Sequence, residues 1–224
     1  MEDAIAVEDL SKVFRSGRNH AVWALQNVTF RLAPGTLLLL TGNNGSGKTT
    51  LLKILATLIL PTSGAAFING YDVVRNSLAA RRQVGICWSD DRAIYWRLTG
   101  EQNLMFFGTL YGLSKRQIRQ RISQLKRHFR LDFLHRPVCQ CSTGMRQRLI
   151  LVRALLHDPS VLLLDEPTRS LDQEVIAALS EWLGAQRDSP KTVLLTTQRP
   201  EELRVGGRIG MLESGRLMPM GKAR

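Results

Sequence analysis

The sequence predicts an α/β domain with a mostly parallel sheet, an antiparallel β portion at the N-terminus and an inserted all-helical subdomain. Short apolar runs such as Leu37–Leu40 and Val161–Leu164 are typical of buried parallel strands. Segments with helical periodicity separate these runs, as in βαβ units. With 224 residues, 44% of them hydrophobic, the chain is long enough to form one domain with a substantial core.

The N-terminal portion reads as β-structure. Ile5–Val13 and Val28–Leu32 alternate apolar and polar residues, which is typical of strands with one buried face. Phe14 follows the first of these segments, and its spacing fits a core position as well as an exposed position that stacks on adenine. At the other end of the chain, Ile209–Leu212 and Arg216–Met218 predict a closing hairpin.

A glycine-rich segment between the strand Thr36–Leu40 and the helical pattern Thr50–Ala56 fits the phosphate-binding pattern G-x-x-x-x-G-K-[ST]. Glycines let successive N–H groups turn toward an anion, and the start of the helix adds its positive dipole end. Lys48 can reach the β- and γ-phosphates, and the Thr49 hydroxyl can bind Mg²⁺. The sequence therefore predicts a nucleoside triphosphate site, and its residues are Gly42, Asn43, Asn44, Gly45, Ser46, Gly47, Lys48, Thr49 and Thr50.

The middle of the chain is helical. Apolar residues recur at helical spacing after Thr99, over Lys115–Phe129 and over Ser142–His157. We therefore expect a single domain over residues 1–224, in which a helical subdomain interrupts the nucleotide-binding core. The expected bounds are about 90–158 for the subdomain, and 1–89 and 159–224 for the core.

Two carboxylates, Asp165 and Glu166, follow the apolar run Val161–Leu164. Asp165 at the end of a strand can hold Mg²⁺, usually through water, and Glu166 can orient and polarise an attacking water. Acidic residues at a strand end can also serve only to keep that end exposed to water, but the phosphate-binding pattern upstream favours a role in phosphoryl transfer. The next apolar strand, Thr192–Thr197, has the polar end Thr196-Thr197-Gln198, where a side chain such as that of Gln198 could sense the γ-phosphate.

The net charge of +12 has three interpretations. Much of the excess lies in residues 115–136, where Asp132 is the one acid. A solvated helical face, attraction to an anionic membrane surface and nucleic-acid binding would each account for it. We expect no specific nucleic-acid partner, because no groove-reading motif and no interleaving of aromatic and basic residues accompanies the charge.

Cysteine usage and hydropathy suggest where the chain resides. Cys139 and Cys141 lack a second Cys/His pair for zinc, so with Cys87 they read as reduced packing residues. The apolar runs are too short to cross a bilayer, and the acidic N-terminus lacks the features of a signal peptide. We therefore expect a cytoplasmic protein.

With these motifs in place, nearly the whole chain resembles the ATP-binding subunit of an ABC transporter, which has a RecA-like P-loop NTPase core. The phosphate-binding pattern, Glu166 and the segment Ser170–Asp172 fall where that family places them. The family's signature loop, usually Leu-Ser-Gly-Gly-Gln, is here Cys141–Met145, at the start of the helix that leads to the acidic strand.

The resemblance implies ATP and Mg²⁺ as cofactors and a second ATP-binding subunit as partner, identical or different. In the family two subunits meet head to tail, and each ATP lies between one phosphate loop and the partner's signature loop. Ser142 and the Gly144 N–H would meet the γ-phosphate held by the partner, and Asp172 would lie in the dimer loop. Closure of the pair would drive a membrane permease, and hydrolysis would reopen the pair.

Three positions depart from the family's pattern. Ser89 replaces a Gln that contacts Mg²⁺ and water, with Asp90 able to substitute through a bridging water. Gln198 replaces the usual switch His and cannot carry a positive charge or shuttle a proton. In the signature loop, Thr143 stands for the first Gly and Met145 for the Gln.

Because Glu166 is intact, we expect a slow ATPase. One alternative is a subunit that binds ATP beside a more active partner chain. Another is a soluble ABC-type ATPase that acts on ribosomes or nucleic acid. The basic charge favours that second alternative, but such proteins usually carry two ATPase units or a long coiled-coil insertion, and neither fits within this chain.

The run Phe106–Leu113 resembles the ATPases paired with ABC-2-type exporter permeases, which move lipids, polysaccharides or drugs. Ordinary packing of the helical insert would also explain this run, and an importer is the alternative. The family places the permease's coupling helix against the insert and the bend near Ser89. We therefore expect a polytopic permease to contact Trp88–Trp96 at the cytoplasmic face of the membrane, with core packing as the alternative for these aromatic side chains.

Overall fold

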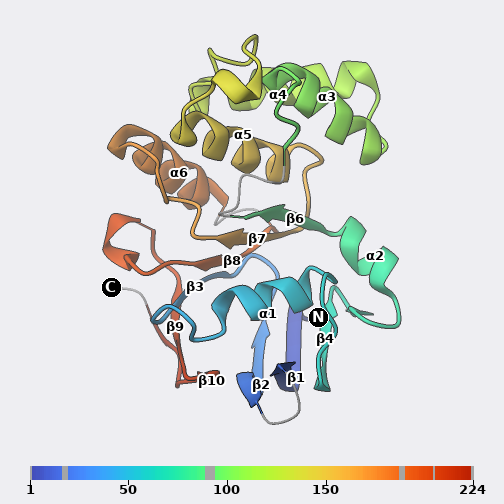
Figure 1. Ribbon diagram of the computed structural model, residues 1–224, viewed down its shortest axis with the longest axis vertical. Helices are drawn as coiled ribbons and strands as arrows, with labels where there is room; N and C mark the ends of the chain where they lie inside the picture. The colour runs from blue at the N-terminus through green and yellow to red at the C-terminus, as the bar shows by residue number, and fades with distance from the viewer. Residues whose placement is uncertain (1, 17–19, 89–93, 187–189, 204, 223–224) are drawn as a thin grey trace.

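Two β-sheets enclose helix α1 (Lys48–Leu55) in the computed structural model (Figure 1). The structure describes residues 2–16, 20–88, 94–186, 190–203 and 205–222. The first sheet is antiparallel, in the order β2-β1-β4-β5. Its strands are β1 (Ile5–Ser16), β2 (His20–Leu32), β4 (Ser63–Ile68) and β5 (Tyr71–Asp72).

The second sheet is mostly parallel, in the order β10-β9-β3-β8-β7-β6. Strands β10 and β11 run antiparallel to β9, whereas the pairings among the other strands are parallel. This confirms the predicted fold class. The strands are β3 (Leu37–Thr41), β6 (Val84–Cys87), β7 (Val161–Asp165), β8 (Thr192–Thr196), β9 (Arg208–Glu213), β10 (Arg216–Leu217) and β11 (Gly221–Lys222).

Strand β2 begins well before the predicted Val28. The β1–β2 pairing contains register shifts around Leu10 and Lys12, and Asn27 in β2 has a positive φ of 48°. Such bulges shift the alternation of inward and outward side chains along a strand. The first half of β2 therefore lacks the sequence pattern of a half-buried strand.

Helices cover both faces of the parallel sheet and extend beyond one of them (Figure 1). Helices α3, α4 and α5 all lie between β6 and β7 in the chain, and α5 packs against β6 while α3 and α4 lie farther from the sheet. Capping boxes start these three helices. The helices are α2 (Ser77–Arg82), α3 (Gly100–Leu110), α4 (Lys115–His128), α5 (Thr143–Leu155) and α6 (Gln173–Ala185), with short 3₁₀ turns at Val138–Gln140 and Pro200–Glu202.

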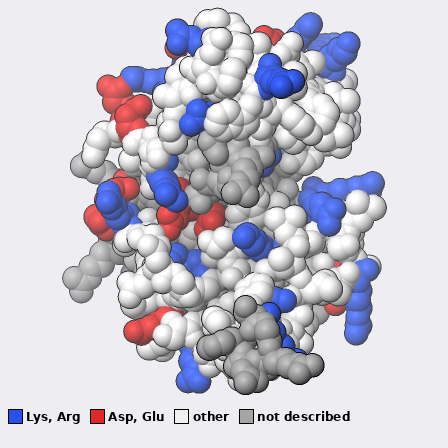
Figure 2. All heavy atoms as spheres, viewed as in Figure 1, with Lys and Arg blue, Asp and Glu red and all other residues white. Residues whose placement is uncertain are grey.

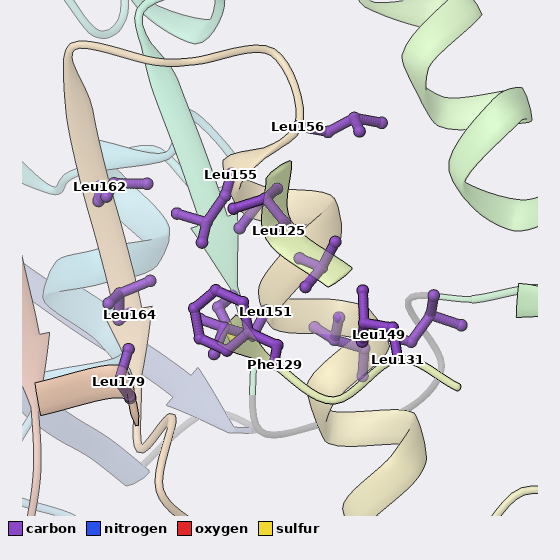
Figure 3. Packing of buried hydrophobic residues seen from close by; sticks show 14 of the residues in the cluster. Leu125, Phe129, Leu131, Leu149, Leu151, Leu155, Leu156, Leu162, Leu164 and Leu179 are labelled. Atoms are coloured by element: carbon purple, nitrogen blue, oxygen red, sulfur yellow. The ribbon is translucent and has the colours of Figure 1, made fainter. Parts of the chain in front are cut away.

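The core lies in two layers, one on each face of the parallel sheet. Along β3, Leu38 and Leu40 belong to the layer that includes α1, and Leu37 and Leu39 to the opposite layer. In that opposite layer, leucines of β7 pack toward α5 and Phe129 (Figure 3). Strand β7 is buried on both faces, which explains its uninterrupted apolar sequence.

His157, just after α5, is largely buried and gives the fold a pH-dependent contribution. Its ring stacks on Tyr111 with centroids 3.8 Å apart, and Nε2 lies 3.2 Å from the Val84 carbonyl oxygen. Burial lowers the pKa of His157 to about 4. Because the folded pKa lies below the unfolded value, the neutral ring supports folding fully above pH 6.5, and this support is lost as the pH falls toward 4.

Because of His157, we expect the free energy of unfolding of the protein to fall by on the order of 3 kcal/mol between pH 6.5 and pH 4. The variant His157→Gln lacks this titrating group, so its free energy of unfolding should fall correspondingly less over that pH range. Urea unfolding of both proteins at a series of pH values measures the difference. Parallel pH profiles for the two proteins would contradict the prediction.

Candidate functional site

The segment after β3, residues Gly42–Thr50 (the phosphate loop), includes the first turn of α1 and has a backbone that two glycines make possible. Gly42 has a φ of +142°, and Gly47, the N-cap of α1, has a φ of +107°. A Cβ at Gly47 would lie 2.2 Å from the Ala24 carbonyl oxygen, and one at Gly42 would lie 2.2 Å from that of Leu212. Both the conformation and the close approach of other backbone exclude a side chain here.

A matched pair of alanine substitutions tests this account of the loop. Gly47→Ala combines a left-handed φ with a backbone clash, so we expect it to destabilise the protein by about 3 kcal/mol or more and to abolish ATP binding. Gly45 also has a positive φ, of 78°, but a Cβ added there would meet no heavy atom within 4 Å beyond its chain neighbours. Gly45→Ala should therefore cost only about 1 to 2 kcal/mol. Thermal unfolding of the two variants with and without ATP measures both stability and ATP binding. Equal losses of stability in Gly47→Ala and Gly45→Ala would contradict the account.

The phosphate loop holds a buried cation and an unpaired hydroxyl. The Lys48 side chain is 5% exposed, and its Nζ donates to the carbonyl oxygens of Gly42 (2.7 Å) and Asn43 (3.0 Å). Burial lowers the pKa of Lys48, and the charges of Glu166 and Asp165 oppose that shift. The buried Ser46 Oγ has no hydrogen-bond partner among the described residues. Donors and an unpaired hydroxyl at the start of a helix fit a phosphate chain.

The acidic end of β7 meets the phosphate loop. Both carboxylate oxygens of Asp165 accept hydrogen bonds from Thr49 Oγ1 (3.0 and 3.2 Å), and one also accepts from Thr196 Oγ1 (2.7 Å). The hydroxyl of Thr49 and the carboxylate of Asp165 are hard oxygen ligands that suit Mg²⁺. The described residues contain no cluster of three His, Cys, Asp or Glu side chains fit for a metal, and Mg²⁺ at such sites takes its remaining ligands from phosphates and water.

Glu166 lies at the rim of the same site. Its φ is +46°, and its N–H donates to the Thr196 carbonyl oxygen and hydroxyl oxygen, both at 3.1 Å. Gln198 Nε2 donates to Glu166 Oε1 and to Asn44 Oδ1, both at 2.7 Å. Gln198 thus connects the phosphate loop to the acidic strand end, beside a groove of about 580 Å³. The sequence places Thr196 at a polar strand end where a residue could sense the γ-phosphate, but it does not predict the hydrogen bond of Thr196 to Asp165.

Phe14 lies on the surface. Its side chain is 45% exposed at the position in β1 opposite Val22, and Lys12 Nζ lies 5.1 Å from its ring centroid. The structure thus excludes the core position that the sequence left open. An exposed ring remains available for stacking.

The signature loop, Cys141–Met145, starts helix α5. Ser142 Oγ accepts from the Met145 N–H at 3.2 Å, and Met145 Sδ lies 3.5 Å from the Ser142 N–H, so the methionine completes the cap. A Cβ on Gly144 would lie 2.8 Å from the Ser170 carbonyl oxygen. Within the described ranges, no hydrogen bond of Ser142–Met145 reaches the phosphate loop.

The segment Ser170–Asp172 lies between the signature loop and α6. Asp172 is the N-cap of α6 and accepts from the Val175 N–H at 2.9 Å. This aspartate therefore has a local role in starting a helix. Ser170 has a positive φ of 63°, which turns the chain at this point.

Of the aromatic residues predicted near a partner, Trp88 packs against the core layer that includes α1, whereas Tyr95 lies beside α3. Ser89 and Asp90 are outside the described residues. Trp88 is half-buried, whereas Tyr95 and Trp96 are exposed, which argues against core packing for these two. Tyr95 contacts the rings of Phe106 and Phe107, and the Arg146 guanidinium lies 4.9 Å from the Trp96 ring centroid.

Asn103 of α3 holds this aromatic region in place and was missed in the sequence. Its fully buried side chain accepts from the Tyr95 N–H (2.8 Å) and donates to the carbonyl oxygens of Tyr95 and Thr99 (both 3.0 Å). A buried amide with three partners fixes the path of the loop before α3. Its signal in the sequence is only a polar residue at a core-facing helical position.

Known proteins are similar to this chain in sequence. The model of the ABC transporter family matches residues 25–169. The chain is 32% identical to the ABC transporter ATP-binding protein NatA of Bacillus subtilis, over 97% of this chain and 89% of NatA. It is 40% identical to the daunorubicin resistance ATP-binding protein DrrA3 of Streptomyces coeruleorubidus, over 89% of this chain and 64% of that protein. It therefore spans less than two thirds of DrrA3.

Solved structures of ATP-binding cassettes have the same fold as this chain. The dimeric post-hydrolysis structure of the ATP-binding cassette MJ0796 with ADP and Pi superimposes with a TM-score of 0.86 at 26% identity, over 98% of this chain and 99% of that one. The strand–loop–helix with Lys48 and the acidic end of β7 thus belong to a known ATPase architecture. The chain belongs to the ATP-binding proteins of the ABC transporter family.

Proposed function

We propose that this chain hydrolyses ATP at the interface of a head-to-tail pair, and that closure of the pair drives a separate membrane permease of the exporter type. The observation that carries the proposal is the joining of Glu166, Gln198 and Asn44 by hydrogen bonds at the mouth of the phosphate loop. A carboxylate held beside the phosphate site is placed to act on the water that attacks the γ-phosphate.

The residues divide the reaction between them. Lys48 exchanges its bonds with the loop carbonyls for bonds to phosphate oxygens. Thr49 and Asp165 would hold Mg²⁺, which would neutralise charge on the phosphates. Glu166 accepts a proton as the water oxygen bonds to the γ-phosphorus and the bond to the β–γ bridging oxygen breaks. The products are ADP and phosphate, and the Gln198 amide holds the carboxylate in position.

The signature loop completes the site of a second chain. Ser142 and the Gly144 N–H lie at the start of α5, where donors and the helix dipole favour an anion. Their hydrogen bonds within the described chain leave the phosphate loop uncontacted, which supports action in trans. We assign Asp172 to the pairing surface and Phe14 to adenine stacking, and we place Ser89 near Mg²⁺.

We further propose a single domain in which residues 90–158 form a helical subdomain that carries the signature loop and receives the permease near Trp88–Trp96. No helix in the described ranges is long and apolar enough to cross a membrane, so the permease would hold the chain at the cytoplasmic face. Relatives named for daunorubicin and doxorubicin resistance and for phospholipid transport support a drug-like or lipid substrate. Identical and different partner chains are both compatible with this scheme.

Gln198→His is expected to raise the rate of ATP hydrolysis several-fold. Histidine at this position can keep the hydrogen bond to Glu166 and can also carry a charge or a proton, which the amide cannot. The measurement is kcat of the purified chain together with its permease. Gln198→Ala, which removes the bond altogether, should lower kcat. A histidine variant slower than the native chain would contradict the role assigned to Gln198.

Two experiments test the proposed function as a whole. A tagged chain should co-purify from membranes with a polytopic protein and should support ATP-dependent movement of an amphipathic dye across vesicles that contain that protein. Co-purification with RNA or ribosomes in place of a membrane protein would favour a soluble ABC ATPase. ATP binding with no hydrolysis in the complex would favour the regulatory subunit.

A further inference from the structure

Helix α4 presents a stripe of positive charge along one side. The helix buries Ile118, Ile122 and Leu125 against the rest of the molecule. At about 100° per residue, five exposed cations fall within about 120° of its circumference. The adjoining exposed sector carries three glutamines and a histidine, which are Gln117, Gln120, Gln124 and His128. The five residues, which we call the α4 stripe, are Lys115, Arg116, Arg119, Lys126 and Arg127.

The α4 stripe is scarcely neutralised within the molecule. Lys126 Nζ lies 3.8 Å from Asp132, and in the described part of the chain the other four stripe residues form no ion pair. Neighbouring arginines behave differently. Arg121, on the other flank of α4, pairs with Asp158 and donates to the Leu155 carbonyl oxygen, and Arg130 pairs with Glu174. The stripe is therefore distinct from the cations that hold this part of the fold together.

The placement of the stripe works against the helix itself. Lys115 and Arg116 occupy the first turn, beside the positive end of the helix dipole. Lys115 and Arg119 are four residues apart, where like charges repel. An ordinary solvated face would gain from mixed charges at these positions. Bound anions would turn each of these unfavourable terms into a favourable one.

We propose that the α4 stripe binds the anionic phospholipid headgroups of the membrane that holds the permease. Lys and Arg side chains are visible at the end of the molecule where α3 and α4 lie (Figure 2). Lipid is favoured over RNA because no aromatic side chain interleaves with the cations for base stacking, since Phe129 is fully buried. This choice of lipid rests on the membrane role proposed above.

Vesicle binding by the full chain, without permease, tests the proposal. The probes are phosphatidylcholine vesicles with and without phosphatidylglycerol, at near-physiological salt. Each basic residue near an anionic surface contributes about a fivefold gain in binding, so the triple variant R116Q/R119Q/R127Q should bind anionic vesicles on the order of 100-fold more weakly. The control R75Q/R81Q/R82Q removes the same charge around α2 and should change binding only a few-fold.

Several results would overturn the proposal. They are an equal loss in the two triple variants, equal binding of the native chain to neutral and anionic vesicles, or a loss of RNA binding in the α4 variant with vesicle binding unchanged. The midpoint temperature of thermal unfolding should be unchanged or higher in the α4 variant, because repulsion between like charges within the helix is relieved. ATP hydrolysis with the permease in detergent separates this proposal from the proposed function, since it should be unaffected by the α4 substitutions.

Discussion

Hydrolysis of ATP is expected to fall by about 10² to 10⁴-fold in Glu166→Gln, the range that a general base contributes. The glutamine keeps the size of the side chain and an oxygen that can accept from Gln198, so positioning survives and basicity is lost. ATP binding should be retained, because Glu166 is outside the phosphate loop. Phosphate release under saturating ATP and equilibrium ATP binding measure the two quantities.

The matched control is Glu202→Gln. Glu202 lines the same groove but pairs with Arg199, away from the phosphate loop, so its neutralisation should leave kcat within about twofold of the native value. Equal rates for the native chain and Glu166→Gln would show that another group activates the water. Equal losses in both glutamate variants would point to an effect of the groove's charge.

The substitution Lys48→Met is expected to weaken ATP binding by roughly 10- to 150-fold and to abolish measurable hydrolysis. The buried Nζ donates two hydrogen bonds within the loop, and we expect it to donate to phosphate oxygens when ATP binds. Hydrogen bonds to charged groups are worth about 1.5 to 3 kcal/mol, which corresponds to that loss of affinity. Titration of a fluorescent ATP analogue provides the affinity.

Lys53→Met is the control for this variant, since Lys53 is on the same helix with an exposed side chain. It should bind ATP like the native chain. Thermal unfolding without nucleotide distinguishes loss of a ligand contact from loss of the fold, and Lys48→Met should remain folded. Native ATP affinity in Lys48→Met would contradict the assignment of Lys48 to the phosphates.

The sequence predicts those parts of the site that lie within one short segment. The phosphate loop can be recognised because its glycines, Lys48 and Thr49 act at fixed spacing on one ligand, between a strand and a helix. Asp165 and Glu166 are recognisable for a similar reason, at the end of a fully apolar strand. In each case the chemistry and the local backbone are encoded together.

Contacts between distant segments could not be predicted in the same way. Gln198 and Asn44 are 154 residues apart, and only the pairing of β3 with β8 brings their two strand ends together. Whether Phe14 is buried or exposed depends on register shifts in the β1–β2 pairing, which the alternation of residues does not reveal. Thr196 gains its role from a hydrogen bond to Asp165 on the neighbouring strand.

Mixing two inactive variants tests the shared site most directly. In a head-to-tail pair of Glu166→Gln with Ser142→Arg, one site carries both changes and the other carries neither. Random pairing should therefore restore roughly a quarter of the native ATPase activity, although neither variant is active alone. A site contained in one chain would give no recovery, even when differently tagged chains co-purify as pairs, and that result would contradict the account.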